Sequence, residues 1–179
     1  MKTAAVGREV TLADILSARE KRAEIQLLLV AEHKAPLVSF TVNMPGPMKL
    51  TRESMIIFHE GLNVLVQTLS ERRVATVYKE ACLRETGPEA FISVDCTPHI
   101  LKDMLVTVEN THMLGRLFDF DVISPEGEPL SRSALGYEER KCLLCNQTAH
   151  VCTRSRRHPM KTVLRRIHAL VDMFCQRKA

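Results

Sequence analysis

The stretch GRLFDFDV, residues 115–122, has the composition of a buried strand in which two acidic residues interrupt an apolar run. Because successive side chains of a strand point to opposite faces, Asp119 and Asp121 share one face. Two such carboxylates repel each other and are costly among apolar side chains unless a partner neutralises them. A Mg²⁺ ion that bridges them to substrate phosphates would do so. The pattern therefore predicts a magnesium-binding catalytic pair, with an edge strand that leaves both aspartates in water as the alternative.

Helix and strand patterns alternate on both sides of this stretch. Apolar periodicity predicts helices at residues 11–34, 51–69, 97–108 and 160–174, and strands at residues 37–43 and 90–94. Residues 74–78 fit either state, and SPEGE at 124–128 indicates a turn that closes a hairpin. We expect one α/β (mixed α+β) domain over residues 1–179, with a mixed sheet flanked by helices and a helical, basic C-terminal region. The helix at 11–34 is assigned to packing alone.

Composition limits the class of protein. The 179 residues are 45% hydrophobic and 26% charged, which is ordinary for a globular chain. No uncharged apolar run approaches the roughly 20 residues of a membrane helix, and residues 1–10 lack the pattern of a signal peptide. Six cysteines without an export signal indicate a reducing compartment. We therefore expect a cytoplasmic protein that does not contact a membrane.

The charges are distributed unevenly. Residues 1–131 hold 14 Lys and Arg against 18 Asp and Glu, whereas residues 132–179 hold 11 against 3. With only 6 Phe, 2 Tyr and no Trp, the basic C-terminal third suits phosphates or an acidic protein better than stacked bases. A solvated basic helix face is the alternative.

The loop NMPGPMK, residues 43–49, follows a predicted strand and precedes a predicted helix. Two prolines around a glycine stiffen it, and it delivers Lys49 to a helix N-terminus, where a cation and free amides favour anions. Lys49 is therefore a candidate phosphate contact, with an ordinary strand-to-helix connection as the alternative.

The C-terminal third carries a second cluster of candidate residues. Cys142 and Cys145 form a CxxC pair, followed by His150, Cys152 and His158, which could hold zinc or could pack as free thiols. The residues after the pair, NQTA, lack the expected glycine or proline, and no second CxxC completes the pattern.

Four potential cations follow within five residues, just before the last predicted helix: Arg154, Arg156, Arg157 and His158. Guanidinium groups bind phosphate oxygens in pairs, and a helix N-terminus adds dipolar attraction. A phosphate-binding site is the preferred interpretation.

Six ordered segments resemble one family. They are NMPGPMK (43–49), GPEA (87–90), LGRLFDFDV (114–122), LSR (130–132), RKCLLC (140–145) and CTRSRRH (152–158). Together they resemble apo-citrate lyase phosphoribosyl-dephospho-CoA transferase, also called holo-citrate lyase synthase, from about residue 10 to the C-terminus. The resemblance implies a bacterial cytosolic enzyme of citrate fermentation, and by analogy a nucleotidyltransferase-like sheet.

The implied reaction attaches the phosphoribosyl-dephospho-CoA part of 2′-(5″-triphosphoribosyl)-3′-dephospho-CoA to a serine of the citrate lyase acyl carrier (gamma) subunit, and pyrophosphate leaves. Nucleotidyl transfer needs in-line positioning and cancellation of phosphate charge. We expect Asp119 and Asp121 to hold Mg²⁺, with one of them as a possible general base. The expected pyrophosphate-binding cations are Lys49, Arg116, Arg154, Arg156 and Arg157, with His158 as a phosphate ligand or proton donor.

Two alternatives remain open at this point. A zinc-knuckle binding module that contacts nucleic acid or a protein partner through its basic C-terminal helix would explain the cysteines, here Cys142, Cys145 and Cys152, but would leave the paired aspartates without a role. The same transfer onto a malonate decarboxylase carrier is the second. The transferase interpretation expects no nucleic-acid partner.

Overall fold

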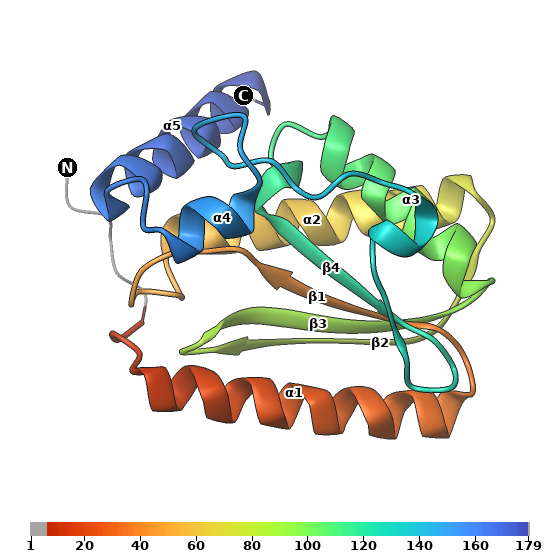
Figure 1. Ribbon diagram of the computed structural model, residues 1–179. Helices are drawn as coiled ribbons and strands as arrows, with labels where there is room; N and C mark the ends of the chain where they lie inside the picture. The colour runs from red at the N-terminus through yellow and green to blue at the C-terminus, as the bar shows by residue number, and fades with distance from the viewer. Residues whose placement is uncertain (1–6, 179) are drawn as a thin grey trace.

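The computed structural model describes residues 7–178. One antiparallel sheet lies between helix α1 on one face and helices α2, α3 and α5 on the other (Figure 1). In chain order the elements are α1 (Leu12–His33), β1 (Leu37–Val42), α2 (Arg52–Glu71), β2 (Ala75–Arg84), β3 (Gly87–Asp95), α3 (Pro98–Thr111), η1 (Gly115–Leu117), β4 (Phe118–Ile123), β5 (Pro129–Leu130), η2 (Ser133–Leu135), α4 (Ala149–Arg154) and α5 (Met160–Lys178).

The sheet has the strand order β2-β3-β1-β4-β5. The predicted α/β class is confirmed, with one difference: every strand pair among the described residues is antiparallel, so the sheet is not mixed. The reason is that α2 and α3 each connect strands two positions apart, and another strand lies between them. The hairpins β2–β3 and β4–β5 supply the remaining antiparallel pairs.

Local signals fix the helix starts. Thr11 and Thr51 each accept a hydrogen bond from the backbone N–H three residues on. The side chains of Asp14 and Ser54 at that position accept the threonine N–H in turn, so both helices begin with a capping box. The turn at 124–128 is closed by the Ser124 N–H, which donates to the Glu128 carbonyl at 2.8 Å. The ambiguous residues 74–78 mostly belong to strand β2, and the strand predicted at 90–94 is the centre of the longer β3.

The two faces of the sheet are packed unequally. The face toward α2, α3 and α5 carries the main core, in which the rings of Phe40, Phe58, Phe118 and Phe120 stack or meet edge to face. The α1 face has a smaller cluster: Leu29, Val30, Leu37, Phe91 and Ile123. Among the other positions of this face, Ser39, Ser93 and Glu89 are polar and nevertheless buried.

Within residues 7–178, no helix is long and apolar enough to cross a membrane. All five strands belong to one sheet. The single transferase domain over residues 1–179 stays a prediction. Residues 1–6 and 179 lie outside the described residues, and so does most of the segment 1–10, which the sequence predicts is not a signal peptide.

Candidate active site

Asp119 and Asp121 lie on the face of β4 that is turned toward α1. Asp119 pairs with Thr41 and Asp121 with Ser39 across strand β1, and directly paired residues of antiparallel strands share a face. The Thr41 hydroxyl donates to Asp119 Oδ2 at 3.5 Å. The predicted common face is therefore confirmed, and β4 is an inner strand of the sheet.

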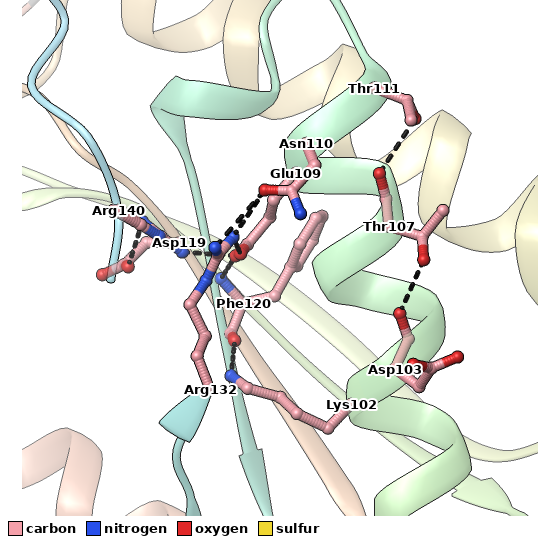
Figure 2. Close-up of polar contacts among 10 residues, drawn as sticks. All are labelled: Lys102, Asp103, Thr107, Glu109, Asn110, Thr111, Asp119, Phe120, Arg132 and Arg140. Carbon is pink, nitrogen blue, oxygen red and sulfur yellow. Dashed lines mark hydrogen bonds and ion pairs between the residues drawn. The ribbon is translucent and has the colours of Figure 1, made fainter. Parts of the chain in front are cut away.

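The outer edge of β4 is covered by side chains of α3 where β5 does not reach (Figure 2). The Phe120 N–H donates to Glu109 Oε1 at 3.1 Å, and Lys102 Nζ donates to the Phe120 carbonyl at 2.9 Å. Both side chains are buried. They satisfy the Phe120 backbone groups that a further strand would otherwise pair. The outer edge of β4 is therefore hydrogen-bonded at the residue between the two aspartates.

Glu109 is the centre of an ion-pair network. Its side chain is 1% exposed and pairs with both Arg132 and Arg140. Arg140 also reaches Asp119, at 3.0 Å from Nη1 to Oδ1 (Figure 2). A buried carboxylate requires such partners. The network therefore fixes Asp119 from the side of α3, while Asp121 has no ion pair or side-chain hydrogen bond among the described residues.

A cavity of about 430 Å³, here called the aspartate cavity, lies between α1 and the sheet. Asp119 and Asp121 line it together with three cations: Arg19 and Arg22 of α1, and Lys49 of the loop before α2. Helix α1, which the sequence assigns to packing, thus also lines this cavity. Its arginines could not be assigned from the sequence, because a polar helix face looks the same whether it meets solvent or a cavity.

The charges in this cavity perturb one another. Burial by the surrounding protein, together with the neighbouring Asp119 carboxylate, raises the pKa of Asp121 to about 6. Asp121 is exposed to water where it lines the cavity. Burial lowers the pKa of Lys49, and the positive charge of Arg19 adds to that effect. The cavity therefore holds two carboxylates that repel each other and cations that repel each other. The carboxylates favour a bound metal cation, and the side-chain cations favour a bound polyanion.

Glu89 holds one wall of the cavity in place. It is buried on β3, pairs with Thr41 in the strand register, and accepts a hydrogen bond from Arg22 Nε at 2.9 Å. Arg84 forms a second ion pair with it. Sequence reasoning missed this residue, although a glutamate before the apolar run at 90–94 was the available signal.

Arg116 lines a different hollow, here called the arginine cavity, of about 610 Å³. The cations that line it are Arg116, Arg132, Arg140, Lys141 and Arg166. Burial lowers the pKa of Arg116, as do the charges of Arg140 and Arg132. Because Arg140 lines this cavity and also bonds Asp119, the two cavities are neighbours that share one ion pair.

The structure does not bring the remaining predicted cations to the aspartates. Arg154, Arg156 and Arg157 are exposed at the end of α4 and line neither the aspartate cavity nor the arginine cavity. His158 lies against Cys145, at 3.3 Å from Nε2 to Sγ. The expected grouping of these residues around one polyphosphate with Asp119 is therefore not what the structure has.

The donor set of the aspartate cavity fits Mg²⁺. Two carboxylates on alternate residues of one strand stand roughly 7 Å apart at their Cα atoms, and Asp121 keeps its oxygens free of ion-pair partners within residues 7–178. Mg²⁺ takes one or two carboxylates and completes its shell with water and substrate phosphates. Asp119 and Asp121 are thus the residues that could hold the ion.

The chain is thus an α/β protein with a five-stranded antiparallel sheet, and its aspartate cavity brings carboxylates and cations together. A family profile described as apo-citrate lyase phosphoribosyl-dephospho-CoA transferase matches residues 10–174. Relatives of that name from Escherichia coli O157:H7, Shigella sonnei and Shigella boydii are 37% identical over 164 residues, covering 91% of this chain and 89% of each relative. The chain belongs to the apo-citrate lyase phosphoribosyl-dephospho-CoA transferase family, so it is a member of an enzyme family.

Proposed function

We propose that this chain transfers the phosphoribosyl-dephospho-CoA group of 2′-(5″-triphosphoribosyl)-3′-dephospho-CoA to a serine of the citrate lyase acyl carrier subunit, with release of pyrophosphate. Family membership supports the reaction. The observation that carries its placement is the aspartate cavity, in which two carboxylates face three cations. Its volume suits the triphosphate end of the donor, since pockets for small ligands measure roughly 300–1,000 Å³.

Different residues of the aspartate cavity have different roles in an in-line displacement. Arg19, Arg22 and Lys49 neutralise the charge that builds up on the departing pyrophosphate. Asp119 and Asp121 would hold Mg²⁺, which would supply charge cancellation on the phosphate oxygens. Arg140 and the Thr41 hydroxyl orient Asp119, so the carboxylate keeps one position as the substrate enters.

The acceptor carrier docks on the basic side of the molecule. The arginine cavity adjoins Asp119 through Arg140, and residues 132–179 carry 11 Lys and Arg against 3 Asp and Glu. Charge complementarity brings an acidic carrier to this side and leaves its serine near the aspartate cavity. Arg154, Arg156 and Arg157, which are exposed here, then serve the carrier and not the pyrophosphate. The reaction belongs in the cytoplasm, where a carrier and its donor are available.

The test is reconstitution. The protein is incubated with apo carrier, the triphosphoribosyl donor and Mg²⁺, and the carrier is weighed by mass spectrometry while pyrophosphate is measured. We expect one added phosphoribosyl-dephospho-CoA group per carrier and one pyrophosphate per addition. A carrier of unchanged mass would refute the proposal.

Two controls separate the alternatives. The apo carrier of malonate decarboxylase tests acceptor choice, and we expect it to be modified more slowly than the citrate lyase carrier. A duplex DNA titration tests the binding-module alternative, which predicts affinity that falls steeply with salt. We expect little binding at any salt concentration.

A further inference from the structure

Four metal-ligating side chains meet beside the arginine cavity, which Cys142 also lines. Cys142 and Cys145 come from the loop after η2, Cys152 from α4, and His158 from the residues before α5. One ligand atom of each lies within 4.8 Å of the others. Three separate segments of the chain thus place three thiols and one imidazole around a single point.

The separations match a tetrahedral metal site better than a disulfide. Cys145 Sγ lies 3.5 Å from Cys152 Sγ and 3.3 Å from His158 Nε2. Zinc bonds of about 2.3 Å to sulfur and about 2.0 Å to nitrogen give tetrahedron edges of roughly 3.5–3.8 Å. A disulfide requires about 2.05 Å between its sulfurs. All four ligand atoms lie within 4.8 Å of one another, so no separation exceeds a tetrahedron edge by more than about 1 Å.

The backbone of the CxxC loop is folded toward the sulfurs. The Leu144 N–H points at Cys142 Sγ at 3.4 Å, and the Cys142 N–H donates to the Gln147 carbonyl at 2.7 Å. The Ala149 N–H donates to the Arg140 carbonyl, also at 2.7 Å. The loop therefore closes without the glycine or proline that was expected after the CxxC pair, and one N–H group is available to stabilise a thiolate.

This part of the chain has almost no apolar core of its own. Between residues 131 and 159, Cys152 is the one fully buried residue. Figure 1 shows that most of this segment before α5 is coil, with the short helix α4 within it. A segment of this length that buries so little apolar surface needs another source of stability. In many small domains a bound metal ion provides it.

We propose that Cys142, Cys145, Cys152 and His158 bind one structural zinc ion that holds residues 140–158 in place. Four protein ligands complete a tetrahedron and leave no open position, so the ion is not part of the transfer chemistry. Three thiolates and an imidazole select zinc over Mg²⁺, which binds oxygen ligands. The site stands independently of the proposed transfer reaction.

The ion has a positional consequence. Cys142 is two residues from Arg140, which pairs with Glu109 and Asp119. Fixing Cys142 therefore limits where the Arg140 guanidinium can lie. Zinc is then a positioning element for the ion-pair network beside the aspartate cavity.

Metal analysis of the intact protein tests the proposal directly. The protein is purified with a thiol reductant and without chelators. Its content of zinc, iron and cobalt is then measured by elemental mass spectrometry. We expect about one zinc per chain. Replacement of zinc with Co²⁺ should give the visible absorption of a tetrahedral cobalt–thiolate centre. Metal-free protein that neither takes up zinc nor gives this absorption would overturn the proposal, as would a disulfide, seen as a mass lower by about 2 Da.

Matched cysteine variants locate the site. Cys152→Ser should reduce bound zinc to about a tenth of the wild-type content or less, and His158→Gln should lower zinc affinity by 10-fold or more. Cys175→Ser is the control, because Cys175 is a partly buried free thiol of α5 outside the cluster, and it should keep the full content. Equal zinc in all three variants would refute the assignment, and the wild-type measurement stands even where a variant fails to fold.

Discussion

Substitution of Glu109 with glutamine isolates the charge that organises the ion-pair network. Glutamine keeps the shape and can still accept the Phe120 N–H, which Glu109 Oε1 accepts at 3.1 Å. It removes the negative charge that faces Arg132 and Arg140, whose side chains are 14% and 19% exposed. The substitution therefore leaves two largely buried guanidinium groups with one partner fewer.

The size of the effect follows from what each arginine retains. Breaking a fully buried pair costs about 3–5 kcal/mol. Arg140 keeps Asp119 at 3.0 Å and Arg132 keeps the Asn110 side-chain oxygen at 3.3 Å, so we expect the low end, about 3 kcal/mol. For a chain of this size, 1 kcal/mol corresponds to about 2–4 °C. The midpoint of thermal unfolding should fall by roughly 6–12 °C.

Urea unfolding followed by circular dichroism measures the free energy, and differential scanning fluorimetry measures the midpoint. Glu138→Gln is the matched control, because Glu138 is 85% exposed and faces Lys141 at 3.7 Å. It should change stability by less than about 0.5 kcal/mol. A Glu109→Gln protein as stable as this control would refute the claim that Glu109 anchors the network.

Three further outcomes are expected. Asp121→Asn should become more stable relative to wild type as pH rises from 4 through 6, because the raised pKa of Asp121 means that folding disfavours its ionised form. Because Asp121 is exposed to water, the gain in the free energy of unfolding is up to about 1 kcal/mol. Urea midpoints across pH measure it, and an equal difference at all pH values would contradict this. Gly61→Ala should lower stability by about 2 kcal/mol, since an added Cβ would lie 2.2 Å from the Phe40 ring; an unchanged melting midpoint would contradict the close packing. Arg19→Gln should raise the KM for the triphosphoribosyl donor about 10-fold with a normal melting midpoint, whereas Lys21→Gln, an exposed change on the same helix, should not.

The elements that the sequence predicted correctly are those set by neighbouring residues. Thr11 and Thr51 begin their helices through contacts that span three residues. The shared face of Asp119 and Asp121 follows from the period of a strand. Such features depend on local chemistry alone, so a single sequence is enough to predict them.

The elements that it missed depend on contacts between distant segments. Strand β2 is an edge strand with exposed residues on both faces, so it has no apolar alternation to reveal it. Arg22 meets Glu89 across 67 residues of sequence and Arg132 meets Glu109 across 23. Arg154 has the residue type of a phosphate ligand but lies on the surface, because the fold places the end of α4 away from the aspartate cavity.

The central claim is that the aspartate cavity carries the chemistry, and the rate of pyrophosphate release by Asp121→Asn tests it most directly. Asp121 has no ion pair to lose among the described residues, so the variant should fold and a drop in rate can be assigned to the site. The account predicts a loss of 100-fold or more with apo carrier, donor and Mg²⁺, about 3 kcal/mol of transition-state stabilisation. A folded Asp121→Asn protein that releases pyrophosphate within about threefold of the wild-type rate would contradict it.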